Sequence, residues 1–193
     1  GTTGNHNNGN QNIFNSTVTV NNQSNTGYFM LSYNSNDLFN DDIIVSSTGA
    51  GGISFGWSGG TGTPVLASGK TISVGGSGYS AGMLQLGSFT QLGTTPINLT
   101  LTGTANFQIV KPNIVCTFNA PLTVTAPDIY VQGGTFNGAT VFTKTGGTAN
   151  NNNGNQNIFN STLTINQQSN NNYFMLGYNS NDLFNDDITV TST

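Results

Sequence analysis

Residues 9–48 read GNQNIFNSTVTVNNQSNTGYFMLSYNSNDLFNDDIIVSST, and residues 154–193 repeat them as GNQNIFNSTLTINQQSNNNYFMLGYNSNDLFNDDITVTST. The two copies align without a gap at an offset of 145 residues, and 32 of their 40 positions are identical. Self-similarity at a fixed period is the sequence signature of a repeat protein. We therefore interpret the chain as one continuous segment, 1–193, with a 145-residue unit (about 9–153) and the first third of the next (154–193).

A shorter repeat lies inside the long unit, marked by the dipeptide Phe-Asn and an apolar strand after it. The motif occurs at Phe14, Phe39, Phe118, Phe136, Phe159 and Phe184. Between the second and third of these it is degraded, but PVLASGKTISV and TQLGTTPINLTL still supply an apolar start and a strand. Counting those two, six turns of about 24 residues fill the unit.

Most turns also contain a second apolar stretch: YFMLSY, GISFGW, GMLQLG, NFQIV, DIYVQ or YFMLGY. Short strands separated by Gly, Asn, Ser and Thr, at a period in the twenties, are typical of a solenoid. The sequence thus predicts an all-β parallel β-solenoid (β-helix) of about eight turns, stacked at about 4.8 Å. Insertions such as GGSGYSAG are expected to bulge from one corner. An antiparallel β-sandwich is the alternative, although it does not explain why Phe-Asn recurs.

The composition agrees with strands and turns. Only 5% of the residues are charged, all seven acids are Asp and all three bases are Lys, so the helix formers Glu and Arg are absent. With a net charge of −4 and no basic cluster, nucleic-acid binding is not expected. No apolar run approaches the roughly 20 residues of a membrane helix.

Alternation along the strands assigns core positions and a row of corner residues. The predicted core includes Phe14, Val18, Val20, Phe39, Phe118, Phe136, Phe159 and Phe184. The Asn after each Phe is expected at the same corner of successive turns, where side-chain amides can hydrogen-bond along the rod. This predicts a structural ladder of Asn15, Asn40, Asn119, Asn137, Asn160 and Asn185.

Six of the seven acids gather in SNDLFNDD and its copy. Because Ca²⁺ prefers oxygen ligands, calcium is a weak candidate at Asp37, Asp41, Asp42, Asp182, Asp186 and Asp187. Their spacing matches neither an EF-hand nor the repeats of calcium-binding β-rolls. The alternative is that these Asp act as turn residues whose charges deter edge pairing. No metal or cofactor is assigned.

No catalytic residues are assigned either. A glycosidase needs two carboxylates about 5 to 9.5 Å apart, whereas Asp41 and Asp42 would face opposite ways and Asp128 stands alone. Cys116 alternates with apolar neighbours and is expected to be a buried, inert thiol. Lys–Asn isopeptide cross-links would need a buried carboxylate beside the lysine, and none is near in sequence to Lys70, Lys111 or Lys144.

Aromatic and Thr side chains are the candidates for surface recognition. Trp57, Tyr33, Tyr79 and Tyr130 could stack on sugars, but alternation with Ile53 and Phe55 predicts that Trp57 is core. Outward Thr residues recur in STVTV, LTLTG, LTVTA, STLTI and ITVTST, and a regular row of this kind would suggest ice binding. The segments DDIIVSS and KTISVGG interrupt the row.

Three stretches carry a family resemblance: 14–45 (FNSTVTVNNQSNTGYFMLSYNSNDLFNDDIIV), 66–107 (LASGKTISV to LTGTANF) and 135–165 (TFNGATVFTKTGG to FNSTLTI). They resemble the long repeat arrays of giant secreted surface proteins of the Bacteroidota, in which a similar unit with an aromatic-Asn-Gly/Asp motif before each strand recurs many times. The chain is architecturally similar to filamentous-haemagglutinin-type β-helical adhesins. The resemblance implies export, surface attachment and a rod-like role, and no catalytic residues.

We therefore expect a non-enzymatic structural segment of a large exported bacterial surface or matrix protein, acting as a stiff spacer, fibre or adhesin stalk. The expected location is secreted or at the cell surface. The expected partners are neighbouring repeats of the same chain, with end-to-end self-association and surface glycans as further candidates. No nucleic acid is expected, and no membrane span in this segment. The alternatives are a glycan- or ice-binding flat face and a polysaccharide-active β-helix enzyme.

Overall fold

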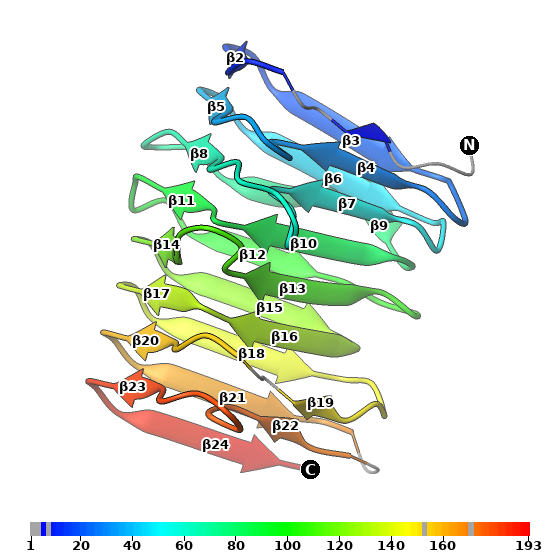
Figure 1. Ribbon diagram of the computed structural model, residues 1–193. Coiled ribbons are helices and arrows are strands. Elements are labelled where there is room, and N and C mark those ends of the chain that lie inside the picture. The colour runs from blue at the N-terminus through cyan, green and yellow to red at the C-terminus, as the bar shows by residue number, and fades with distance from the viewer. Residues whose placement is uncertain (1–4, 7–8, 152–153, 170–171) are drawn as a thin grey trace.

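The strands of the chain wind into a stack of parallel turns (Figure 1). The structure is a computed structural model that describes residues 5–6, 9–151, 154–169 and 172–193. Within these residues there are 24 strands and no helix, and every strand pairing is parallel. The predicted β-solenoid is confirmed, and the antiparallel sandwich is excluded for the described residues.

Each turn contributes one strand to each of three faces. The first, which we call the Phe-Asn face, is an eight-stranded sheet: β2 (Ile13–Phe14), β5 (Leu38–Phe39), β8 (Val65–Leu66), β11 (Thr90–Gln91), β14 (Cys116–Phe118), β17 (Gly134–Phe136), β20 (Ile158–Phe159) and β23 (Leu183–Phe184). These eight strands delimit about seven turns, spaced about 25 residues apart, which is one turn fewer than predicted.

The second, the Thr face, has two parts. One is β3 (Val18–Asn22), β6 (Ile43–Ser47) and β9 (Ile72–Tyr79), and the other is β12 (Ile97–Thr100), β15 (Leu122–Ala126), β18 (Thr140–Lys144), β21 (Leu163–Gln167) and β24 (Ile188–Ser192). The pairing of β6 with β9 shifts register between Val45 and Ser47, and the face is interrupted between β9 and β12. The extra residues of β9 are 75–78, the GGSG part of the insertion GGSGYSAG, which agrees with the predicted bulge.

The third, the Gln face, carries the predicted second strands. It consists of β1 (Asn5–His6), β4 (Tyr28–Leu31), β7 (Gly52–Phe55), β10 (Met83–Gly87), β13 (Asn106–Val110) and β16 (Asp128–Gln132), with the separate pair β19 (Asn150–Asn151) and β22 (Phe174–Met175) beyond β16. After several of these strands the corner has positive φ, at Ser32 (56°), Gly56 (75°), Ser88 (46°), Gly133 (96°) and Gly177 (68°). Glycine adopts this conformation without strain.

Both degraded turns lie in register with the complete ones. Leu66 pairs with Phe39 on one side and with Gln91 on the other, and Gln91 in turn pairs with Phe118. The second copy continues the stack of the first, because Phe136 of the last turn of the unit pairs with Phe159 of the next. The six turns predicted for the 145-residue unit are therefore present.

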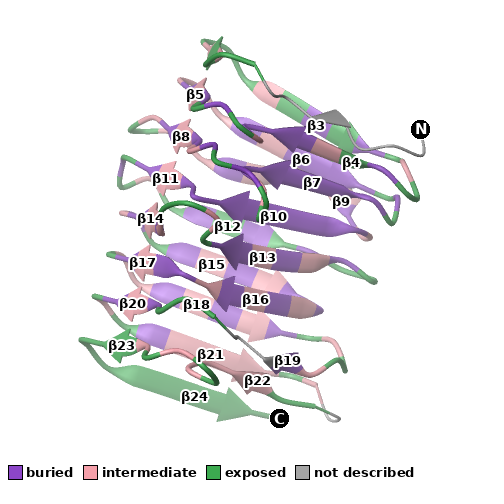
Figure 2. Ribbon diagram, in the orientation of Figure 1, coloured by how far each residue is buried: buried purple, intermediate pink, exposed green. Residues whose placement is uncertain are grey.

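The core runs along the axis of the stack (Figure 2). Neighbouring Phe rings stack at centroid distances of 5.0 Å (Phe14–Phe39), 5.4 Å (Phe118–Phe136), 4.7 Å (Phe136–Phe159) and 5.3 Å (Phe159–Phe184). Where Gln91 replaces Phe, the ring of Phe89 lies 6.1 Å from that of Phe118 and fills the interior.

Most predicted core residues are buried, and the exceptions lie at the two ends of the stack. Phe39, Phe118, Phe136, Phe159 and Val20 are buried. Phe14 and Val18 in the first turn are only partly buried. The core prediction is wrong for Phe184, which is 39% exposed because no further turn covers its outer side.

Candidate functional site

The Asn residues after each Phe form hydrogen-bonded rows on the Phe-Asn face. Asn40 Nδ2 donates to Asn15 Oδ1 at 2.8 Å, and the same bond links Asn137 to Asn119, Asn160 to Asn137 and Asn185 to Asn160 at 2.7 to 2.8 Å. The two rows are separated by Ala67 and Leu92, which occupy the same position in the degraded turns. Asn119 caps its row by donating to Gln91 O at 2.8 Å. These amides bond to one another, which suits a structural role.

Asp37 is fully buried at the corner before β5, where its carboxylate accepts four hydrogen bonds. Asn12 donates its backbone N–H and its Nδ2 to Oδ1, both at 2.9 Å. Ser32 donates its backbone N–H at 3.0 Å and its hydroxyl at 2.9 Å to Oδ2. Asp182 takes the equivalent place in the second copy, with donors from Asn157, Gly177 and Ser180. Both carboxylates are thus occupied by inter-turn and corner contacts.

The other calcium candidates have different surroundings. Asp41 accepts from Thr17 at 3.1 Å and pairs with Lys70 Nζ at 2.7 Å, while Asp42 accepts the Thr71 N–H at 2.9 Å. Asp186 and Asp187 are exposed in the last turn. Among the residues that the structure describes, no three His, Cys, Asp or Glu side chains gather closely enough to hold a metal ion.

The Asp41–Lys70 pair predicts a specific pH dependence. Hydrogen bonds from Lys70 and from the chain around Asp42 lower the pKa of Asp41 from 3.8 to about 2. A carboxyl whose pKa is depressed on folding contributes stability above its unfolded pKa and loses it as the pH falls through its folded pKa. The contribution of Asp41 should therefore disappear between about pH 4 and pH 2. An NMR titration of the Asp41 carboxyl should show a midpoint near 2 that returns toward 3.8 in Lys70→Met; an unchanged midpoint in that variant would contradict this assignment.

The predicted burial of Trp57 is wrong, because Gly56 at φ 75° ends the alternation that Ile53 and Phe55 follow. The indole is half-buried outside the core, with its ring 5.2 Å from that of the exposed Tyr28. Tyr33 is also half-buried. It lies close to Trp57, because a Cβ placed on Gly59 would be 3.6 Å from the Trp57 ring and 3.9 Å from the Tyr33 hydroxyl.

The other two aromatic candidates do not join this group. Tyr79 is buried, donates its hydroxyl to Met83 O at 2.6 Å, and has its pKa raised by burial, so it is no surface residue. Tyr130 lies on the Gln face, where partial burial and the nearby Asp128 raise its pKa. Of the four aromatic candidates, Trp57 and Tyr33 lie near each other outside the core, and Tyr28 lies against Trp57.

Cys116 is fully buried in β14. Its Sγ accepts the Phe89 N–H at 3.3 Å and lies 3.2 Å from Val110 O, and burial raises the pKa of the thiol to about 12. Because the thiolate is the reactive form, we expect no labelling of the folded protein by iodoacetamide at pH 8 and complete labelling in denaturant. Labelling of the folded protein at the rate of free cysteine would contradict this burial.

A column of inward residues two positions before each Phe is not evident from the alternation of the sequence. Asn157 in this column is fully buried, and its Oδ1 accepts the N–H groups of Gly133 and Gly134 at 2.9 and 3.0 Å. Its Nδ2 donates to Val131 O in the previous turn and to Asp182 in the next. The identical Asn-Ile-Phe and Asp-Leu-Phe triplets of both copies are the signal that could have identified it.

A second missed row lies on the Gln face. Ser54 donates to Gln85 at 3.2 Å, Gln85 to Gln108 at 3.1 Å, and Gln108 to Asn106 at 2.9 Å. Ser54 and Gln85 are buried although they point away from the core. Loop 56–64 leans along the stack at this place, because Thr61 O accepts a hydrogen bond from Asn113 two turns further on. The loop thus converts part of an outer face into interior.

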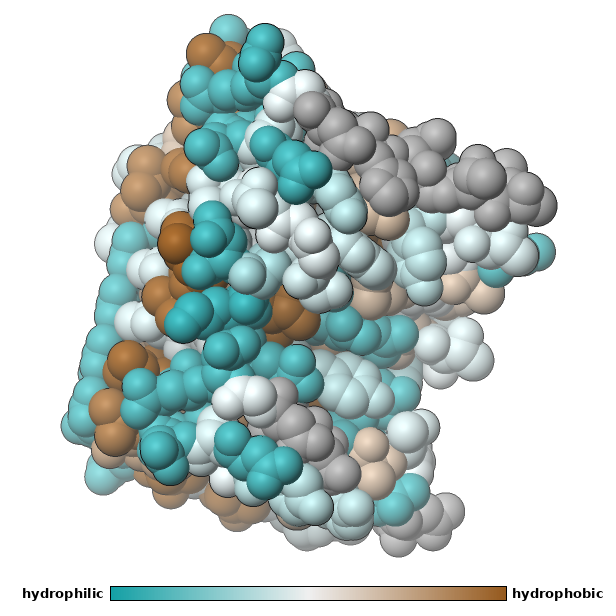
Figure 3. Space-filling model, viewed as in Figure 1, coloured by the Kyte–Doolittle hydropathy of each residue, from teal (hydrophilic) through white to brown (hydrophobic). Residues whose placement is uncertain are grey.

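Apolar residues reach the surface in separate spots along the Phe-Asn face (Figure 3). The most exposed of them there are Ile13 (56%), Leu92 (54%) and Leu183 (46%). Polar residues lie between these spots, so this view shows no broad apolar patch of the kind that marks protein interfaces.

Comparisons of the chain with protein families, with curated protein sequences and with solved structures find no match. No helix of the length and apolarity needed to cross a membrane occurs in the described part of the chain.

Proposed function

We propose that this chain is a segment of a long repeat array in an exported bacterial surface or matrix protein, where it acts as a stiff spacer or stalk. The observation that carries the proposal is the junction between the two copies. Phe136 and Phe159 stack across it at 4.7 Å, and Asn160 donates to Asn137 at 2.8 Å, as Phe and Asn do inside a unit. A junction with the same contacts as the interior can be repeated without limit.

Stiffness follows from the parallel ladders that run along the stack. At the boundary between the two copies the turns pair on all three faces, β17 with β20, β18 with β21 and β19 with β22, and Phe159 stacks on Phe136. The surface is neutral apart from the few Asp and Lys, so salt should affect the rod little. The resemblance to secreted repeat arrays supports the same role.

The spacer function can be tested on cells that display an epitope on two, four or eight tandem copies of the 145-residue unit. The height of the epitope above the surface should rise linearly, by about 29 Å for each six-turn unit. A flexible linker of the same residue number, made of Gly and Ser, is the control, and its height should grow with about the square root of length. The same square-root growth for the repeat units would refute the spacer role.

A second candidate, ice binding, is favoured by the lower part of the Thr face. There the outward positions of five paired strands form two columns: Asn98, Thr123, Val141, Thr164 and Thr189 in one, and Thr100, Thr125, Thr143, Asn166 and Thr191 in the other. In the upper part, Ile44, Ser73 and Gly75 interrupt the pattern. Thermal hysteresis that is lost in Thr143→Lys would support this candidate, and its absence in the unaltered protein would exclude it.

A further inference from the structure

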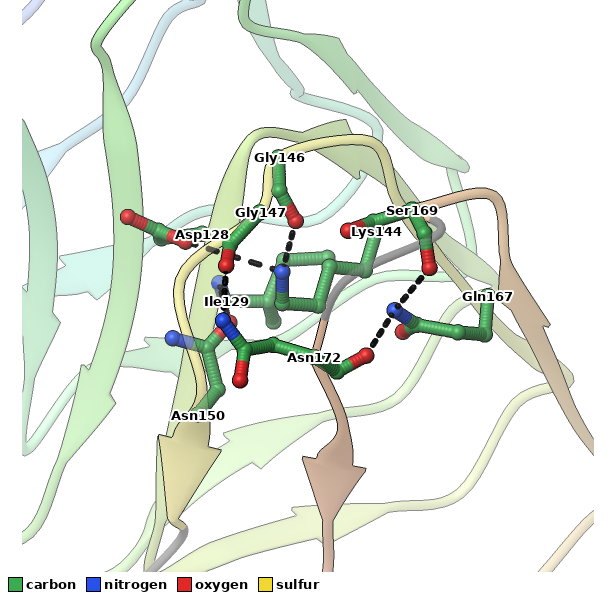
Figure 4. A network of polar contacts seen from close by, with 9 residues as sticks. All are labelled: Asp128, Ile129, Lys144, Gly146, Gly147, Asn150, Gln167, Ser169 and Asn172. Carbon is green, nitrogen blue, oxygen red and sulfur yellow. Dashed lines mark hydrogen bonds and ion pairs between the residues drawn. The ribbon is translucent and has the colours of Figure 1, made fainter.

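Lys144 is a buried lysine at the corner where β18 leaves the Thr face (Figure 4). Its side chain is 1% exposed, and its Nζ donates to Gly146 O. Asp128, the first residue of β16 in the preceding turn, places Oδ1 3.8 Å from this Nζ. No carboxylate is near Lys144 in sequence, but the stacking of turns brings Asp128 beside it from 16 residues away.

The corner hydrogen bond does not itself require a lysine. Gln167 occupies the same register position one turn later, and its Nε2 donates to Ser169 O two residues on, as Lys144 does to Gly146 O. Ser47 makes the same bond to Gly49 O in an earlier turn. A neutral side chain can therefore make this corner hydrogen bond. A buried ammonium carries a desolvation cost in addition, and Asp128 at 3.8 Å offsets it only in part.

Asn150 completes the group from β19. It is fully buried, and its Oδ1 accepts the Ile129 N–H at 3.0 Å, which fixes the orientation of the amide. Within the described residues, its Nδ2 and Asp128 Oδ1 are among the few buried polar atoms that make no hydrogen bond. Figure 4 shows Asp128 linked to Lys144, and Asn150 linked to Ile129, the residue after Asp128, at this corner.

We propose that Lys144 and Asn150 become joined by an intramolecular isopeptide bond that the protein forms by itself. Lys144 Nζ attacks Asn150 Cγ, the Nζ–Cγ bond forms, and the Cγ–Nδ2 bond breaks. Asp128 takes the proton from Nζ and delivers it to Nδ2, which leaves as ammonia. The Ile129 N–H stabilises the negative charge that develops on Oδ1. Electrons and atoms balance without any oxidant or cofactor.

Two features of the corner suit this chemistry. Burial lowers the pKa of Lys144, which favours the neutral amine that acts as nucleophile. Asn150 is held in place by strand pairing, since its N–H donates to Tyr173 O in the next turn at 3.0 Å. The bond would close the loop 145–149 and fasten β18 to β19 in the turn just before the second copy begins.

The mass of the intact, purified chain tests the proposal directly. We expect a mass about 17 Da below that of the sequence, the mass of the released ammonia. Lys144→Arg and Asp128→Asn should both restore the full mass, while Gln167→Ala, at the neighbouring corner, should leave the deficit unchanged. Circular dichroism of each variant shows whether the solenoid has formed, and the measurement on the unaltered chain does not depend on any variant.

Trypsin digestion of the denatured protein locates the bond. The chain has no Arg, and Lys111 precedes a proline that blocks cleavage, so the cuts fall after Lys70 and Lys144. An isopeptide at Lys144 abolishes the second cut and leaves 71–193 as one fragment, while cleavage after Lys70 serves as the internal control. A full mass with complete cleavage after Lys144 would overturn the proposal. So would a deficit that maps to another asparagine, or a deficit of about 18 Da from condensation with Asp128.

Discussion

Replacing Phe136 with Ala is expected to lower the free energy of unfolding by about 4 kcal/mol. The ring lies in the centre of the Phe column, stacked between Phe118 and Phe159 at 5.4 and 4.7 Å and edge-on to Phe142 at 6.0 Å. Its removal leaves a cavity that neighbouring turns cannot close, because their spacing is set by backbone hydrogen bonds. Urea unfolding followed by circular dichroism measures the loss.

The matched control is Phe184→Ala, which removes the same ring from the last turn. Phe184 is 39% exposed and stacks on one side only, against Phe159 at 5.3 Å. We expect a loss of about 1 kcal/mol from the smaller buried area. Equal losses for the two variants would show that the ring column is not the main source of stability.

The second large effect is expected for Asp37→Asn, which should destabilise the protein by on the order of 3 kcal/mol. The carboxylate accepts four hydrogen bonds from Asn12 and Ser32 in a fully buried site. An amide presents an NH₂ group toward two of these donors, so two buried donors lose their acceptor. Urea unfolding again gives the value.

Asp42→Asn is the control for this substitution, because it makes the same chemical change five residues away. Asp42 is half-buried and accepts the Thr71 N–H at 2.9 Å, a bond that an amide oxygen can still accept. Its expected effect is about 1 kcal/mol or less. If both variants lowered the free energy of unfolding by the same amount, the four buried hydrogen bonds of Asp37 would not be an important source of stability.

The columns of the solenoid could be predicted because identical residues recur at them. Phe14, Phe39 and Phe118 stand at the same place in the repeat, so their common environment follows from stacking alone. The degraded turns were found from an apolar start, even where Gln91 stands in the Phe position. There Phe89, two residues earlier, fills the space that Gln91 leaves.

Contacts made by corners and loops could not be predicted from alternation. Trp57 leaves the core face because one residue, Gly56, turns the chain with positive φ. The burial of Ser54 and Gln85 depends on loop 56–64 lying along the stack, which no local pattern encodes.

Side chains from different turns pose the same difficulty. Asp128 and Lys144 are 16 positions apart and meet only because β16 and β18 belong to consecutive turns. The number of residues in each loop decides such meetings, and these loops vary in length from turn to turn. A repeat period therefore predicts strands and columns more securely than it predicts polar groups at the corners.

The account depends most on the claim that successive units continue one stack without a break. Electron cryomicroscopy of a chain with several tandem copies of the 145-residue unit tests it directly. We predict a continuous straight rod, with layers about 4.8 Å apart and an axial repeat of about 29 Å. Separate globules joined by flexible links, or particles without the 4.8 Å layers, would contradict it.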